Sequence, residues 1–182
     1  DPRWSAALAD PEALVARAAA MALAAAGIDP AGLSVSVLLT SDAALAGLNA
    51  RFRGKAGATN VLSFPAEDLA PAAPGAAPRP PGRETPDGEA APLGDLALAY
   101  ETCAAEAGAA GLALETHALH LVLHGTLHLL GFDHVEDADA ERMERLETEA
   151  MLAAGLPDPY LAQLQPEGRP PAAPPSDGSD GR

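Results

Sequence analysis

Three of the five histidines in this 182-residue chain have the spacing of metal ligands. They lie in residues 124–134, HGTLHLLGFDH, where His124 and His128 are four positions apart. On an α-helix, the two imidazoles would project from one face and could approach a single ion together. A third ligand cannot come from another turn of the same straight helix. Histidines eight residues apart are separated by about 12 Å, whereas each ligand lies about 2.1 Å from a bound zinc ion.

Gly131 offers a way for a third histidine to reach the same ion. A glycine in the left-handed conformation ends a helix and turns the chain back, so His134 can approach from outside the helix. Three neutral imidazoles leave the fourth position of a tetrahedral ion open for water, as in catalytic zinc sites. The pattern therefore predicts that His124, His128 and His134 bind one zinc ion per chain, in preference to forming an ordinary polar helix face.

The other two histidines precede this motif on the same expected helix. His117 and His120 lie about two turns and one turn before His124. They could hydrogen-bond to a metal ligand, contact a substrate or simply lie on the helix surface, and the sequence leaves these roles open.

The histidine spacing is also that of the metzincin proteases, which makes a zinc metallopeptidase an alternative. In HExxH motifs the residue after the first histidine is a glutamate that acts as general base. Here that position is Gly125, which has no side chain to move a proton. The sequence therefore argues against peptidase chemistry while keeping the metal site.

Residues 124–134 closely resemble the signature of the YbeY family, the bacterial ribosomal-RNA maturation factors described as metal-dependent endoribonucleases. Two further segments are similar to that family: the run from Arg53 to TNVLSFP at 59–65, and LGD at 93–95. The chain departs from the family pattern at Ala56 and Ala58, where relatives commonly carry an acid and a proline, so we expect a looser loop there.

The resemblance implies a single-strand-specific endoribonuclease that acts in ribosomal-RNA processing, including 3′-end maturation of the small-subunit RNA, and in ribosome quality control. It matches Arg53 to the family's functional arginine near the metal and places Thr59, Asn60 and Ser63 along the same groove. Asp133 is a candidate for proton transfer or for orienting one of the metal-binding residues. The implied partners are ribosomal RNA and the ribosome or its assembly factors. A non-catalytic, zinc-stabilised ribosome-assembly factor remains a further alternative.

Composition limits how RNA could be bound. The net charge of −15 argues against a general nucleic-acid-binding surface, because phosphate contacts normally rest on clustered Lys and Arg. Arg51, Arg53 and Lys55 form one local basic cluster, which without the family resemblance we would interpret as a solvated helix end. We expect RNA contact there, and no binding to DNA.

The single Cys103 cannot form an internal disulfide, and no apolar run approaches the ~20 residues that span a bilayer. These features favour a cytoplasmic protein without a membrane partner. The chain starts at Asp1 without a recognisable signal peptide or an initiator methionine. The oligomeric state is left open.

The order of expected elements predicts an α+β (α/β-like) domain with a small mixed β-sheet packed with helices and the metal motif on a central helix. The YbeY-like fold also has an N-terminal strand, which here would have to precede or overlap Asp1.

We assign residues 1–65 and 93–160 to one metal-dependent hydrolase domain. Residues 66–92 form an expected disordered Pro/Ala/Gly-rich insertion, and residues 161–182 an expected disordered tail. We expect strands at 33–39, 58–64 and 94–99. We expect helices at 11–26, from Thr40 or Ser41 to about 50, at 101–110, at about 115–130 and from 137 onward. The acids of this last helix are expected on a solvated face.

Overall fold

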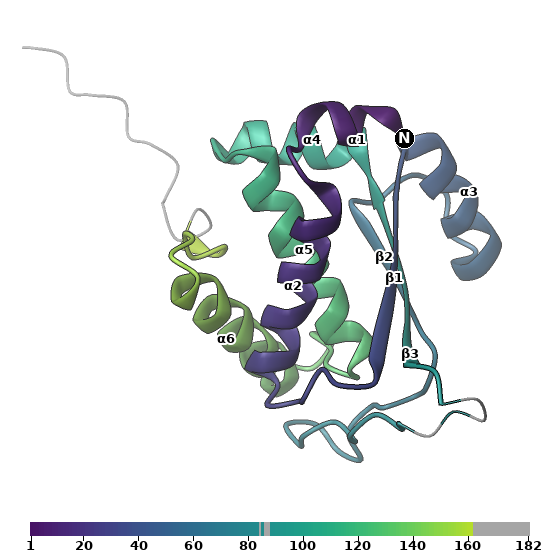
Figure 1. Ribbon diagram of the computed structural model, residues 1–182, viewed down its shortest axis with the longest axis vertical. Coiled ribbons are helices and arrows are strands. Elements are labelled where there is room, and N and C mark those ends of the chain that lie inside the picture. The colour runs from purple at the N-terminus through teal and green to yellow at the C-terminus, as the bar shows by residue number, and fades with distance from the viewer. Residues whose placement is uncertain (84, 86–87, 162–182) are drawn as a thin grey trace, which may run out of the picture.

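The computed structural model describes residues 1–83, 85 and 88–161. Within these ranges a three-stranded sheet separates one helix from the remaining helical layer (Figure 1). None of the helices in these ranges is long and apolar enough to cross a membrane. The helices are α1 (Pro2–Ala7), α2 (Pro11–Ala25), α3 (Asp42–Arg53), α4 (Tyr100–Ala110), α5 (Leu114–Leu129) and α6 (Asp137–Ala153), and the strands are β1 (Leu33–Thr40), β2 (Val61–Pro65) and β3 (Ala91–Ala99).

The sheet is mixed, as predicted. Its order is β1-β3-β2, with β1 parallel to β3 and β2 antiparallel to β3. Close packing between β3 and β2 depends on Gly94, whose φ is 139° and whose added Cβ would lie 2.3 Å from the carbonyl oxygen of Phe64. The α+β class predicted from the sequence is confirmed.

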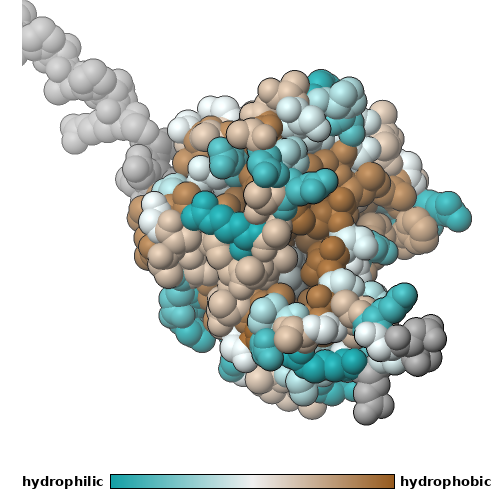
Figure 2. Space-filling model, in the orientation of Figure 1, coloured by the Kyte–Doolittle hydropathy of each residue, from teal (hydrophilic) through white to brown (hydrophobic). Residues whose placement is uncertain are grey.

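The two faces of the sheet pack against different helices. One face carries Leu96 and Leu98 of β3, which join the main core with α2, α5 and α6. The opposite face packs Ala97 and Ala99 against Leu45 of α3 in a smaller cluster. In the view of Figure 2, hydrophobic residues gather over the strands and hydrophilic residues surround them.

Helix α5 is the central element of the larger layer. Buried residues cover most of its circumference, as befits the central helix that the sequence predicts, and they include Leu119, Val122, Leu123 and Leu127. The helix contacts α2, α4, α6, β2 and β3. A helix held on so many sides is a rigid support for side chains on its remaining face.

Local capping signals explain where the helices begin and end. Asp10 accepts a hydrogen bond from the backbone N–H of Ala13 at 2.9 Å, and Pro11 occupies the first turn of α2, where no N–H is needed. Ser41 caps α3 in the same way, and Gly54 ends that helix in the left-handed conformation. Arg51 and Arg53 thus lie in the last turn of α3.

Two elements differ from the sequence prediction. Helix α1 was not predicted. It is too short for a periodic pattern and is held by Trp4, which is 1% exposed and donates its indole N–H to the carbonyl oxygen of Thr40 at 3.0 Å. Strand β2 begins only at Val61, because Gly54 and Gly57 both adopt positive φ in the preceding loop.

The described residues of the predicted insertion, 66–92, form no helix or strand until β3 begins at Ala91. Leu69 is nevertheless buried against the rest of the domain, at 5% exposure. The disorder expected for this insertion stays a prediction. The predicted tail, apart from Leu161, lies outside the described residues.

Candidate metal centre

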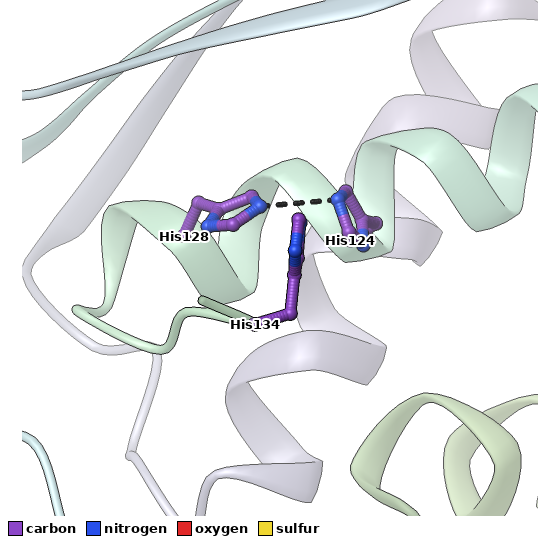
Figure 3. Close-up of side chains that lie close together, drawn as sticks. All are labelled: His124, His128 and His134. Atoms are coloured by element: carbon purple, nitrogen blue, oxygen red, sulfur yellow. Dashed lines mark hydrogen bonds between the residues drawn. The ribbon is translucent and has the colours of Figure 1, made fainter. Parts of the chain in front are cut away.

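The structure brings His124, His128 and His134 together at the end of α5 (Figure 3). Their ligand nitrogens all lie within 4.8 Å of one another. The ring of His134 is centred 5.4 Å from that of His124 and 5.0 Å from that of His128. The arrangement joins two residues of one helix face to one residue of the following turn, as the spacing predicts.

The turn after α5 delivers His134. Gly131 adopts φ 85° and donates its N–H to the carbonyl oxygen of His128 at 3.0 Å. Phe132 then donates its N–H to the carbonyl oxygen of Leu127 at 3.1 Å. These two bonds satisfy carbonyls that the ending helix leaves unpaired and reverse the chain, so His134 returns toward the helix face.

Hydrogen bonds on the far sides of two rings determine which nitrogens face the site. The Nδ1 atom of His124 lies 2.8 Å from Oε1 of Glu147, and Nδ1 of His128 lies 3.0 Å from the carbonyl oxygen of Phe132. A carboxylate and a carbonyl only accept hydrogen bonds, so each Nδ1 must carry the hydrogen. Each Nε2 then presents a lone pair.

These two Nε2 atoms face each other at 3.1 Å. Two lone pairs at this distance repel unless a cation lies between them. Two nitrogens bound to one tetrahedral zinc ion would be about 3.4 Å apart, so only a small adjustment is needed. Burial, together with the nearby His124 and His134, lowers the pKa of His128 to about 4, so this ring is neutral near pH 7. The three residues therefore fit a metal ion.

Two clefts meet at this centre. The first, of about 670 Å³, is lined by His128 together with Arg53, Ser63 and Asp133. The second, of about 550 Å³, is lined by His124 and by polar and aromatic side chains, namely Asn60, Glu106, His117, His120 and Tyr160. The histidine cluster is thus open to ligands from two sides.

Arg53 and Asp133, the two residues predicted to act beside the metal, line the first cleft from different elements. Arg53 is exposed in the last turn of α3. Asp133 is also exposed, and its Oδ1 accepts a hydrogen bond from the backbone N–H of His134 at 2.8 Å. This places both groups where a cleft ligand can meet them, and their roles in chemistry stay predictions.

Ser63 has an unusual environment on the wall of the first cleft. Its side chain is buried, and its Oγ has no hydrogen-bond partner within the described part of the chain. A buried hydroxyl without a partner is unfavourable, so it is available to a ligand. Asp95 of the LGD segment, by contrast, is exposed on the α3 side of the sheet, where it lines an apolar groove with Phe52 and Phe64.

Position 125 faces the sheet. A Cβ built on Gly125 would lie 2.9 Å from a methyl carbon of Leu96 and 3.2 Å from Oγ of Ser63. The glycine therefore permits close packing of α5 on the sheet, and a larger side chain there would displace those neighbours.

Glu147 is the main residue that sequence reasoning missed. The acids of the last helix were expected on a solvated face, which is wrong for Glu147, since its exposure is 0%. The detectable signal was its position in a buried stripe, because Met143 and Met151 lie four residues to either side and are each 1% exposed. Leu152 of the same helix lies outside this stripe and is 55% exposed.

The two earlier histidines also make defined contacts. His120 Nε2 lies 2.5 Å from Oε2 of Glu147, which supports the hydrogen-bonding role among those left open for it. His117 Nε2 lies 2.9 Å from Oε2 of Glu106, and Asn60 donates to the same oxygen at 3.0 Å. Neither residue is a plain surface histidine.

Comparison with known proteins agrees with the sequence motifs. Residues 5–155 match the family described as Endoribonuclease YbeY. Curated proteins of that name include one from Dinoroseobacter shibae, 52% identical over 88% of this chain and 86% of the relative, and one from Ruegeria pomeroyi, 48% identical over 90% and 95%. A third, from Cereibacter sphaeroides, is 46% identical over 88% of this chain and 94% of the relative. With a family match across most of its length and relatives of this similarity, the chain belongs to the YbeY family.

Proposed function

We propose that this chain is a metal-dependent endoribonuclease that cleaves single-stranded RNA. Membership of a family named for endoribonuclease activity supports the reaction class. The observation that carries the proposal is the pair of Nε2 lone pairs of His124 and His128, which face each other at 3.1 Å beside His134.

The three histidines would hold one ion, and the all-imidazole ligand set suits zinc. Bound there, zinc supplies Lewis-acid chemistry that activates water and neutralises charge on a phosphodiester. Three ligands leave a coordination position free for this chemistry, and the position would be reached through the adjoining clefts.

Arg53 is proposed to hold the negative charge that develops on the phosphodiester. A guanidinium can donate two parallel hydrogen bonds to phosphate oxygens, and Arg53 lines the same cleft as His128. The Oγ of Ser63 on that cleft wall, which has no hydrogen-bond partner among the described residues, can donate a further hydrogen bond to the bound strand. Asp133, exposed in the same cleft, is the proposed group for moving a proton.

We further propose that the substrate is ribosomal RNA, with action at the 3′ end of the small-subunit RNA and in ribosome quality control within the cytoplasm. The ribosome or its assembly factors would then be partners. The net charge of −15 favours RNA binding through a local contact at Arg53 and the metal over binding through a broad cationic surface.

The peptidase alternative rests on the histidine spacing alone, and the comparisons give it no support. The position at which HExxH peptidases carry their glutamate is Gly125, which lies against Leu96 and Ser63 of the sheet. Nothing in the comparisons favours a purely non-catalytic assembly factor either, because the matched family is named as an enzyme.

A direct test compares RNA and peptide cleavage by one pure preparation. We expect zinc-loaded protein to cut a single-stranded RNA, and cleavage to be lost on treatment with a chelator and in His128→Ala. A duplex RNA of the same sequence and an unstructured peptide serve as controls. Metal-dependent peptide cleavage that outpaces RNA cleavage, or no cleavage of any RNA by metal-loaded protein, would overturn the proposal.

A further inference from the structure

A single buried carboxylate connects the metal centre to two elements beyond it. Glu147 of α6 is fully buried and lies within hydrogen-bond distance of His124, His120 and Tyr160. Its Oε1 faces Nδ1 of His124 at 2.8 Å, and its Oε2 faces Nε2 of His120 at 2.5 Å. Tyr160, which follows α6, donates its hydroxyl to Oε2 at 2.8 Å.

This carboxylate is satisfied on both oxygens, which explains how a charge can be accommodated in the interior. An isolated buried carboxylate would take up a proton, because burial disfavours the charged form. Here His120, His124 and Tyr160 all lie within hydrogen-bond distance of its two oxygens, which compensates the carboxylate for its lost hydration. A carboxylate in this setting acts as an acceptor and requires a donor on each of its three neighbours.

The need to donate to Glu147 determines which ring nitrogen of His124 carries the hydrogen. A neutral imidazole carries one hydrogen, and an isolated ring can place it on either nitrogen. Beside Glu147, the hydrogen of His124 must lie on Nδ1, which leaves the Nε2 lone pair directed at Nε2 of His128. With the hydrogen on Nε2 the ring could not bind a metal through that atom.

We propose that Glu147 is a positioning residue that holds His124 in its metal-binding tautomer, and that His120 and Tyr160 hold Glu147 in turn. The inference rests on the metal site of the proposed function but extends it to α6 and to the segment after α6. Hydrogen-bonded carboxylates behind metal-binding histidines typically change metal affinity by about 10- to 100-fold.

Tyr160 has an ordinary alternative role as a residue that merely covers the end of α6. Its geometry argues for more, because its hydroxyl reaches the buried carboxylate and its ring packs edge-on against His120 with centroids 6.1 Å apart. Burial and the charge of Glu147 raise the pKa of Tyr160, so its hydroxyl keeps its hydrogen and remains a donor.

The first test reads the tautomer of His124 in metal-free protein at pH 8. Long-range ¹H–¹⁵N spectra show which ring nitrogen carries the hydrogen, and the chain has only five histidines to resolve. The signal of His124 is assigned by its disappearance in His124→Gln. We expect hydrogen on Nδ1 in the wild type. A wild-type spectrum with the hydrogen on Nε2 would overturn the proposal whatever the variants do.

The second test measures zinc affinity by competition with a chromogenic chelator. We expect Glu147→Gln to bind zinc about 10- to 100-fold more weakly and to lose the fixed tautomer of His124. Tyr160→Phe, which removes one hydrogen bond from the carboxylate, should weaken binding by about three- to tenfold. Glu144→Gln removes an exposed charge from the same helix and should leave both measurements unchanged.

Circular dichroism confirms that each variant is folded before its affinity is compared. Zinc affinity of Glu147→Gln within threefold of wild type, or an equal loss in Glu144→Gln, would overturn the positioning role. If Glu147→Gln fails to fold, the wild-type tautomer and the affinity of Tyr160→Phe decide. None of these measurements uses RNA, so a failure of the proposed nuclease activity would be seen separately.

Discussion

Leu69 packs directly on Gly131, so closely that a Cβ on the glycine would lie 2.6 Å from the carbonyl carbon and oxygen of Leu69. The contact joins the segment after β2 to the turn that delivers His134. It places two constraints on position 131, since the residue also adopts φ 85°. Any residue other than glycine at this position would both clash with Leu69 and have a strained backbone.

Gly131→Ala should therefore destabilise the protein by about 2 kcal/mol or more and weaken metal binding, because the turn that carries His134 must shift. Gly155→Ala is a matched control, since Gly155 has a similar φ of 73° but nothing within 4 Å of its added Cβ. Denaturant unfolding and zinc titration of both variants measure the difference. Equal losses in the two variants would show that the contact with Leu69 is unimportant.

Metal content should be one ion per chain. In the described residues, the one group of side chains arranged to hold an ion is His124, His128 and His134. Elemental analysis should thus find one tightly bound metal in the wild type and little in His128→Ala. His117→Ala, in the second cleft, should keep its metal. Two tightly bound ions, or undiminished binding in His128→Ala, would contradict the site.

Arg53→Ala should retain fold and metal but lose RNA cleavage by about 100-fold, as when a single charge-stabilising donor is removed. Arg53→Lys should recover little, because one ammonium cannot reproduce the two parallel hydrogen bonds of a guanidinium. Arg51→Ala, from the same last turn of α3, controls for loss of charge. Single-turnover cleavage at moderate salt compares them, and wild-type rates in Arg53→Ala would rule out the role.

Cys103 should be unreactive in the folded protein. Its exposure is 0%, and burial, reinforced by the charge of Glu106, raises its pKa to about 12. A thiol reagent at pH 8 should label it only when the chain unfolds, since the thiolate is the reactive form. Rapid labelling of native protein would contradict this burial.

The same shift predicts how stability changes in alkaline solution. The unfolded thiol ionises near its ordinary pKa of 9, whereas the folded thiol keeps its proton to about 12. The unfolded state therefore binds fewer protons between these values, and the free energy of unfolding should fall as pH rises through this window. Cys103→Ala should remove this contribution, which unfolding curves at pH 8 and pH 10 can measure.

The features predicted well from sequence are those that short stretches determine. The ligand spacing, the turn at Gly131 and the cap at Asp10 each depend on residues within one or two helical turns. The fold class followed from the order of such elements. The resemblance to known sequences added Arg53, whose place in the same cleft as His128 depends on packing between α3 and the sheet.

What remained unpredicted depends on contacts between distant parts of the chain. Helix α1 is held through Trp4 and Thr40, a contact across 36 positions that no local pattern reveals. Glu147 meets His124 across 23 positions, and its charge made a solvent-facing position the natural expectation. The carboxylate can be buried because His120 and His124 of α5, together with Tyr160, offer it donors.

The segment between β2 and β3 begins and ends at nearly the same point of the sheet. Pro65 is opposite Gly94, and the N–H of Ala66 donates to the carbonyl oxygen of Leu93 at 2.9 Å. Once a flexible loop is closed in this way, doubling its length costs only about 0.6 kcal/mol of closure entropy. That is less than the roughly 0.8 kcal/mol associated with burying one methylene group. Away from the contact between Leu69 and Gly131, the connection is accordingly a place where an affinity tag or reporter sequence could be inserted while the strands that carry Ser63 and Leu96 stay paired.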